Sequence, residues 1–269
     1  MDQIEKFVAL SDPGEVNRKA HNKGDRIVVQ ISNVFAWLFP ILMIAIVSQV
    51  IIRQLGHNQA WLDDLQWWLY GSAVMVGIAY AVTTDSHVRV DIFYDGFSEE
   101  KKAKISIFGL TWLFLPFIIM CWDLTFHYAV ASVEAGEGSS SPNGLHGLYL
   151  LKIFMNLTFI LIAFAAWSAY RRELAKLTEP KLWKTLLIAF PSTMFIVNLV
   201  VFYVIFWAIR LTAGSETTNR DIMRMDIFDT VEFLAYEIKF TILITLVVTF
   251  ALLLITRLLD RGASSTGER

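Results

Sequence analysis

Six long apolar runs constrain the fold of this chain more than any other feature of its sequence. Each run has roughly 20 residues, the length that crosses a hydrocarbon core of about 30 Å at about 1.5 Å per residue. Helices are expected, because an open sheet would leave backbone groups without hydrogen bonds in lipid. The sequence therefore predicts an all-α integral membrane protein with about six transmembrane helices. The runs cover approximately residues 28–52, 65–82, 105–131, 148–170, 186–209 and 240–259.

The composition agrees with a membrane protein and weakens several other classes. Apolar residues make up 55% of the 269 positions, which is above the usual share in soluble domains. The formal net charge is only −2, so bulk charge gives no support for binding nucleic acid. Cys121 is the single cysteine, which excludes an intramolecular disulfide and a zinc or iron–sulfur site built from cysteines.

Lysine and arginine are distributed unequally between the two sets of connections. Seventeen lie in the N-terminal arm, the second and fourth connections and the tail, against four in the other connections. Because short cytoplasmic loops carry the excess of positive residues, both termini are predicted to be cytoplasmic. We divide the chain into an N-terminal arm (1–26), a four-span core (27–175), a two-span C-terminal extension (176–260) and a cytoplasmic tail (261–269).

Two short segments have the composition of helix N-termini. Ser98 precedes Glu99 and Glu100, an order that suits capping and the helix dipole at the start of the third span. Thr178 stands before Glu179 and Pro180, which predicts the same role ahead of the fifth span.

Three ionisable residues fall within the predicted spans. Asp123 and His127 are four residues apart in the third span, so they share one helical face. Lys152 enters the antiparallel fourth span at a depth similar to His127 and somewhat shallower than Asp123, with which it could pair. Intramembrane charges are costly, which makes a coupling-ion or proton site one hypothesis. The preferred interpretation is a structural pair, or side chains that reach the outer interface.

Small residues repeat every four positions in the second span. Ala73, Gly77 and Ala81 share one face, and such a face lets another helix approach closely. Asn33 and Gln49 of the first span could form hydrogen bonds across to this span. Packing within the chain is the default interpretation, whereas a small-residue face left open to lipid would indicate a partner protein.

The segment DSHVRVDIFY, Asp85 to Tyr94, alternates polar and apolar residues just after the second span. In an extended backbone Asp85, His87, Arg89 and Asp91 would share one side. We therefore expect extended or irregular backbone along the cytoplasmic interface. A metal site from Asp85, His87 and Asp91 would need a further ligand that the neighbouring sequence does not supply.

These residues carry a resemblance to a known family. Residues 61–66, 70–71, 77–81 and 85–94 resemble the small permease subunit, DctQ type, of tripartite ATP-independent periplasmic (TRAP) transporters, and D-x-H-V-R-V-D-x-x-Y is the most specific string. Residues 137–139, 144–145 and 150–152 are similar to the branch labelled for mannitol, chloroaromatic and 2-oxo acid substrates. That branch usually has proline where this chain has His146, which predicts a different turn. The resemblance spans about residues 25–175.

The resemblance implies a scaffold subunit of a secondary active transporter in the bacterial cytoplasmic (inner) membrane. In such systems a periplasmic solute-binding protein captures the solute, and a large DctM-type permease subunit carries the substrate and sodium sites. The small subunit, surrounded by membrane lipid, braces the fixed part of the large one during symport of an organic-acid-like solute. By this resemblance the chain has no catalytic residue, substrate site, metal or cofactor. The C-terminal extension lies outside the common four-span pattern of the family, and its role, whether added scaffold area or partner contacts, stays open. A structural or subunit-contact role is implied for the signature residues Asp85, His87, Arg89, Asp91 and Tyr94.

Two alternatives stay open from the residues alone. A membrane anchor of a redox enzyme would need a haem or quinone site, and His127 is the only histidine within a predicted span. A self-sufficient carrier would need internal repeats or broken helices along a polar path. The sequence has no convincing internal repeat and none of the common hydrolase or nucleotide-binding motifs.

Overall fold

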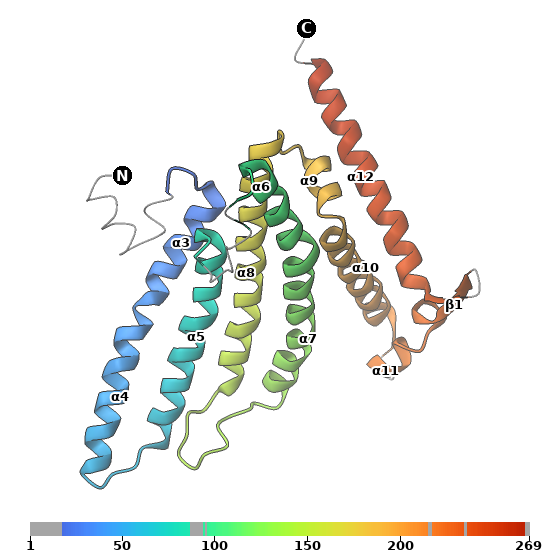
Figure 1. The fold of residues 1–269 in the computed structure, drawn as a ribbon. Coiled ribbons are helices and arrows are strands. Elements are labelled where there is room, and N and C mark those ends of the chain that lie inside the picture. Colours follow the sequence, from blue (N-terminus) through green and yellow to red (C-terminus); the bar gives the residue numbers. More distant parts are fainter. Residues whose placement is uncertain (1–17, 87–93, 95, 215–216, 234–235, 267–269) are drawn as a thin grey trace. The chain divides into compact units, whose positions relative to one another are not determined.

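The computed structural model describes residues 18–86, 94, 96–214, 217–233 and 236–266 (Figure 1). Within these residues six helices are long and apolar enough to cross a membrane, which confirms the predicted all-α membrane class. Contacts divide the chain into two compact units, Met1–Thr178 and Glu179–Arg269. The assignment of the arm, core, extension and tail stays a prediction.

The first unit is a helical bundle arranged around α8 (Leu148–Leu177). This helix contacts α3 (Lys23–Ala36), α5 (Ala60–Thr84), α6 (Glu99–Phe108) and α7 (Leu115–Glu134). The π-helical turn η1 (Gly109–Phe114) joins α6 to α7, and α4 (Leu38–Gln54) packs against α5. Figure 1 shows these helices running side by side.

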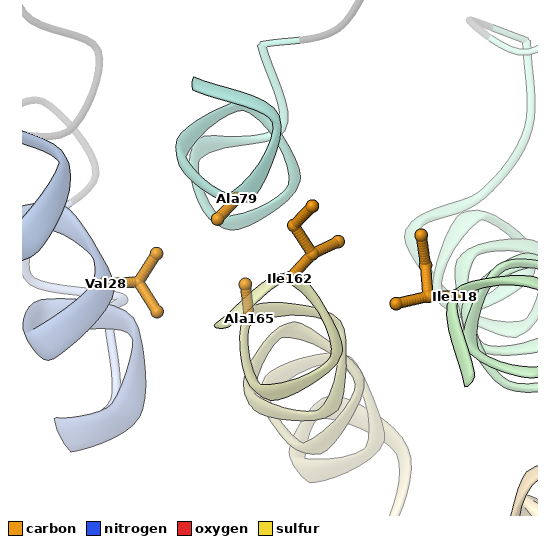
Figure 2. Close-up of a cluster of buried hydrophobic side chains, with 5 residues drawn as sticks. All are labelled: Val28, Ala79, Ile118, Ile162 and Ala165. Atoms are coloured by element: carbon orange, nitrogen blue, oxygen red, sulfur yellow. The ribbon is translucent and has the colours of Figure 1, made fainter. Parts of the chain in front are cut away.

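The centre of the first unit is a small apolar cluster. It has one side chain each from α3, α5 and α7 and two from α8, and all five are at most 4% exposed. Figure 2 shows that Ala79 and Ala165 face Val28. In the same view Ile162 is directed toward Ile118. The two alanines let α5, α8 and α3 approach closely, as small residues do between membrane helices. The cluster members are Val28, Ala79, Ile118, Ile162 and Ala165.

Two prolines mark interruptions within the spans. The first span changes from α3 to α4 at Trp37, because Pro40 lacks an N–H and its ring crowds the carbonyl four residues earlier. In the third span η1 ends just before Pro116, which lies in the first turn of α7. Both spans therefore remain single transmembrane elements with local breaks.

The helix ends confirm one capping prediction and contradict the other. The Ser98 side chain accepts a hydrogen bond from Lys101 N, so Ser98 caps α6 as predicted. Thr178 does not start a helix: its N–H donates to Leu174 O at 2.9 Å, and it ends α8. The next helix, α9 (Leu182–Ile188), begins after Lys181, so Pro180 lies ahead of this helix and not in its first turn.

The second unit contains the last two spans, α10 (Phe190–Thr212) and α12 (Phe240–Thr266), which pack against each other. Asn198 on α10 accepts a hydrogen bond from Thr245 on α12 at 3.2 Å. Between them lie α11 (Asn219–Ile222), the 3₁₀ turn η2 (Asp226–Phe228) and an antiparallel hairpin of β1 (Thr230–Phe233) and β2 (Tyr236–Lys239). The hairpin was not predicted from the sequence.

Candidate functional site

The signature segment begins where α5 ends. Asp85 has left-handed backbone angles, φ 59° and ψ 32°, a conformation that Asp adopts more readily than most residues. Ser86 N donates to Ala81 O at 3.1 Å, which is the six-to-one bond of a Schellman motif. The Thr84 and Ser86 hydroxyls lie 2.9 Å apart. The chain therefore leaves α5 at Asp85 through a defined turn.

Tyr94, the last signature residue, is anchored on α6. Its hydroxyl lies 3.4 Å from the Ser106 hydroxyl, and its ring meets Phe97 edge-on at 6.4 Å. The Lys102 ammonium lies 5.8 Å from the centre of the Tyr94 ring. Asp85 and Tyr94 line the same cavity beside α6 and α8. The remaining signature residues fall outside the described residues, so their contact role and their extended backbone stay predictions: His87, Arg89 and Asp91.

The start of α5 is tied to the end of α4 by polar side chains. Gln49 donates to the Asp63 carboxylate and accepts from the Gln66 amide. The Arg53 guanidinium lies 3.7 Å from the other Asp63 oxygen. The predicted hydrogen bond from Gln49 to the second span is confirmed, and that of Asn33 stays a prediction. This contact joins the first two spans at their predicted outer end.

The neighbouring residue, Asp64, holds the connection between α7 and α8. Its carboxylate accepts from Leu145 N at 2.8 Å. A Cβ on Gly144 would clash with the Asp64 carboxylate and with the Ser139 side chain, so glycine is required at this position for close approach. The adjacent 137–139 and 144–145 motifs thus form a connection that is fixed to α5.

Lys152 has a carboxylate partner in the same connection. The Lys152 ammonium donates to Glu137, which also accepts from the Ser132 hydroxyl at 2.6 Å. The ammonium lies 3.7 Å from the centre of the Tyr128 ring, a cation–π contact. Lys152 and Ser132 hydrogen bonds lower the pKa of Glu137 below its ordinary value. Glu137 was expected in this connection, but its pairing with Lys152 was not predicted from the sequence.

Asp123 and His127 lie on α7, and the α7–α8 contact close to them is polar. Asn156 donates to Trp122 O and to the Thr125 hydroxyl, both at 3.0 Å. Hydrogen bonds of this kind hold membrane helices together and fix their register. The contacts of Lys152 and Asn156 support a structural role for the polar residues between α7 and α8. The pairing of Lys152 with Asp123, and a coupling site at Asp123 and His127, stay hypotheses.

The small-residue face of α5 is divided. Ala73 is buried at 3% exposure and Ala81 is half-buried. Gly77 is exposed, and apart from the backbone of its own helix and its two neighbours an added Cβ there would meet no heavy atom of the described residues within 4 Å. The face therefore extends from the chain interior to an open position at Gly77. A role of this face in helix packing stays a prediction.

A second polar contact, missed in the sequence, closes the opposite end of the bundle. Asn22 and Asp25 form a capping box at the start of α3. Asn22 donates to Ser168 O at 2.9 Å and accepts from the Ser168 hydroxyl at 2.6 Å. Asp25, which is 0% exposed, binds the Arg172 guanidinium at 2.6 Å. We call these four residues the N-terminal clasp, because they lock α3 to α8; the Asn-x-x-Asp spacing was the available signal.

His21 lies buried beside the clasp, at 5% exposure. Burial lowers the pKa of His21, while the Asp25 carboxylate opposes this shift. A base with a lowered pKa in the folded state resists protonation there, so folding is destabilised as the pH falls below the ordinary value of 6.5. We expect the unfolding temperature to drop more between pH 7.5 and pH 5.5 in the unmodified protein than in His21→Gln. Equal drops would contradict this assignment.

The fold and these contacts define the class: a multi-pass α-helical membrane protein. Polar contacts join the first and fourth spans at one end of its first unit and link the first four spans at the other. A family model, described as the DctQ component of tripartite ATP-independent periplasmic transporters, matches residues 42–176, half of the chain. The chain therefore belongs to this family, which supplies a transporter component and is not a family of enzymes. The matched region lies within the first unit. Comparison with curated proteins and with solved structures gave no match.

Proposed function

We propose that this chain is a scaffold subunit that braces a large DctM-type permease subunit in the bacterial cytoplasmic membrane. A periplasmic solute-binding protein delivers an organic-acid-like solute, and a sodium gradient drives its import. Membership of the DctQ family across residues 42–176 is the observation that carries this proposal. The proposal assigns no substrate site to the chain itself. It assigns the chain to the branch labelled for mannitol, chloroaromatic and 2-oxo acid substrates.

The arrangement of polar contacts supports the bracing role. The N-terminal clasp fixes α3 to α8 at one end, and Asp63 and Asp64 fix α5 to its neighbours at the other. Between these ends the helices pack through alanines and isoleucines. A bundle held at both ends resists the motion of a transport domain, as a fixed scaffold must.

The open position at Gly77 is the proposed contact with the large subunit. Leucine at this position is accommodated by the chain's own fold, because the space around the Cβ is open. The larger leucine side chain would, however, push away from α5 any helix of a partner that packs against this face. We expect Gly77→Leu to weaken association with the large subunit at least about fivefold, which is about 1 kcal/mol.

The test is uptake into proteoliposomes that contain the large subunit, with the binding protein outside. Uptake should require this chain and should stop when sodium is replaced by choline. Gly77→Leu should reduce uptake, whereas Gly71→Leu, the same change at another open glycine of α5, should not. Uptake by this chain alone would favour the self-sufficient carrier, and uptake by the large subunit alone would contradict the bracing role.

A further inference from the structure

A cavity of ≈ 790 Å³ lies in the first unit between α5, α6, η1 and α8. Its volume is in the range in which proteins bind ligands of several hundred daltons. Two lining residues, Ile78 and Ile105, are each 41% exposed, so the cavity opens sideways toward the surrounding lipid. A molecule of the bilayer can therefore enter it without crossing the protein.

The two ends of the cavity differ in chemistry. Near the start of α6 and the end of α8 its lining is charged, and farther along α5 and η1 it is apolar, with Ile78, Leu110 and Phe114. The charged end has three carboxylates and three cations, which sum to zero. These are Asp85, Glu99, Glu173, Lys102, Arg172 and Lys176.

One wall of the cavity, formed by α6 and η1, is about as long as one leaflet of a bilayer is deep, whereas the lining on α5 and on α8 spans about 10 Å each. The continuous helical path from Glu99 to Phe114 rises by about 22 Å at 1.5 Å per residue. One leaflet with its headgroups is about 20–22 Å deep, half of the 40–45 Å bilayer. The charged end lies toward the side of the membrane predicted to be cytoplasmic. It would therefore be at the level of the headgroups of the cytoplasmic leaflet.

The wall also contains the π-helical turn. Gly109, Leu110 and Phe114 of η1 all line the cavity. π-Helical turns are rare and occur frequently at functional sites. An added Cβ on Gly109 would meet no heavy atom of the described residues within 4 Å, so this position leaves room beside the wall.

We propose that this cavity binds one zwitterionic phospholipid, a role separate from the proposed transport function. Its phosphate would lie against the cations of the charged end and its ammonium group against the carboxylates, with acyl chains along α5 and η1. The cations there are paired with carboxylates: Lys102 lies 3.1 Å from Glu99 and Lys176 2.8 Å from Glu173. A zwitterion presents both charges to such pairs, whereas an anionic headgroup would also meet the three carboxylates.

Native mass spectrometry of the full-length, delipidated chain tests the proposal, with phosphatidylethanolamine as the probe. We expect one bound lipid per chain and at least tenfold weaker binding to Gly109→Leu, which fills the cavity. Gly71→Leu is the matched control, because Gly71 is equally open but does not line the cavity. Lys102→Gln combined with Lys176→Gln should weaken binding at least fivefold, and these changes serve if Gly109→Leu does not fold.

Five outcomes would contradict the proposal, in whole or in part. The first three are no bound phosphatidylethanolamine, equal binding to Gly109→Leu and Gly71→Leu, and binding unchanged by the paired lysine substitutions. The fourth is tighter binding of phosphatidylglycerol, which would show an anionic-lipid site. Glycerophosphoethanolamine, the same headgroup without acyl chains, should not bind, and its binding with equal strength would remove the role assigned to the apolar wall.

Discussion

Replacing Arg172 by methionine is expected to lower the free energy of unfolding by about 3–5 kcal/mol, the cost of leaving a buried charge without its partner. Arg172 binds the carboxylate of Asp25, which is 0% exposed. Methionine keeps most of the side-chain volume but leaves this carboxylate without its cation. The change should also loosen α3, whose capping box uses the same carboxylate. Reversible unfolding in detergent micelles measures the effect.

Two further variants show whether the buried pair is the cause. Asp25→Asn combined with Arg172→Met should be more stable than Arg172→Met alone, because the asparagine removes the unpaired charge and can keep the capping bond. Lys176→Met breaks an ion pair whose lysine is 54% exposed, so it should cost at most about 1 kcal/mol. Similar losses for Arg172→Met and Lys176→Met would contradict the clasp.

Lys152→Met is expected to release the connection between α7 and α8. The ammonium of Lys152 is the cationic partner of Glu137, and its loss removes a charge-assisted hydrogen bond. We expect amide exchange in residues 137–147 to become about tenfold faster, since local opening governs exchange. Hydrogen–deuterium exchange measured peptide by peptide gives the result.

The same contact predicts a dependence on pH. Because the pKa of Glu137 is lowered in the folded state, its stabilising contribution is present above the ordinary value of 4.5 and is lost as the pH falls through the folded-state pKa. Acidification should therefore speed exchange of the connection in the unmodified protein and have less effect in Lys152→Met. Lys104→Met, which breaks an exposed pair with Glu100, is the matched control. Equal exchange in Lys152→Met and Lys104→Met would show that Lys152 does not hold the loop.

The spans were predictable because apolar length and the cost of unpaired backbone groups are properties of the local sequence. The Ser98 cap was equally local, since the hydrogen bond joins residues three apart. Thr178 misled because Thr-Glu-Pro is compatible with a helix start, whereas the preceding helix continues to Leu177. Local composition could not show whether this threonine ends the preceding helix or starts the next one.

The contacts between distant residues were the part that the sequence could not supply. Asp25 and Arg172 are separated by 147 positions, and nothing in either neighbourhood predicts the other. For Lys152 the nearest acid in helical depth was Asp123, but the connection folds back so that Glu137 reaches the ammonium. The openness of Gly77 likewise depends on which face of α5 the other helices cover.

The β1–β2 hairpin was missed for a different reason. Its strands are four residues each and carry no long alternating pattern. Their antiparallel register pairs Thr230 with Lys239 at the open end of the hairpin, and so short a pairing leaves no period that can be recognised from the sequence. The segment lies outside the residues matched by the family model, so the resemblance gave no expectation for it either.

The most direct test of the scaffold role is to purify the tagged full-length chain from its native membrane in mild detergent and to identify the retained proteins by mass spectrometry. The account predicts a large, many-spanning permease subunit in near-equal amount, and less of it with Gly77→Leu than with Gly71→Leu. Retention of a haem or flavin protein in place of the permease would contradict the account and favour the anchor of a redox enzyme.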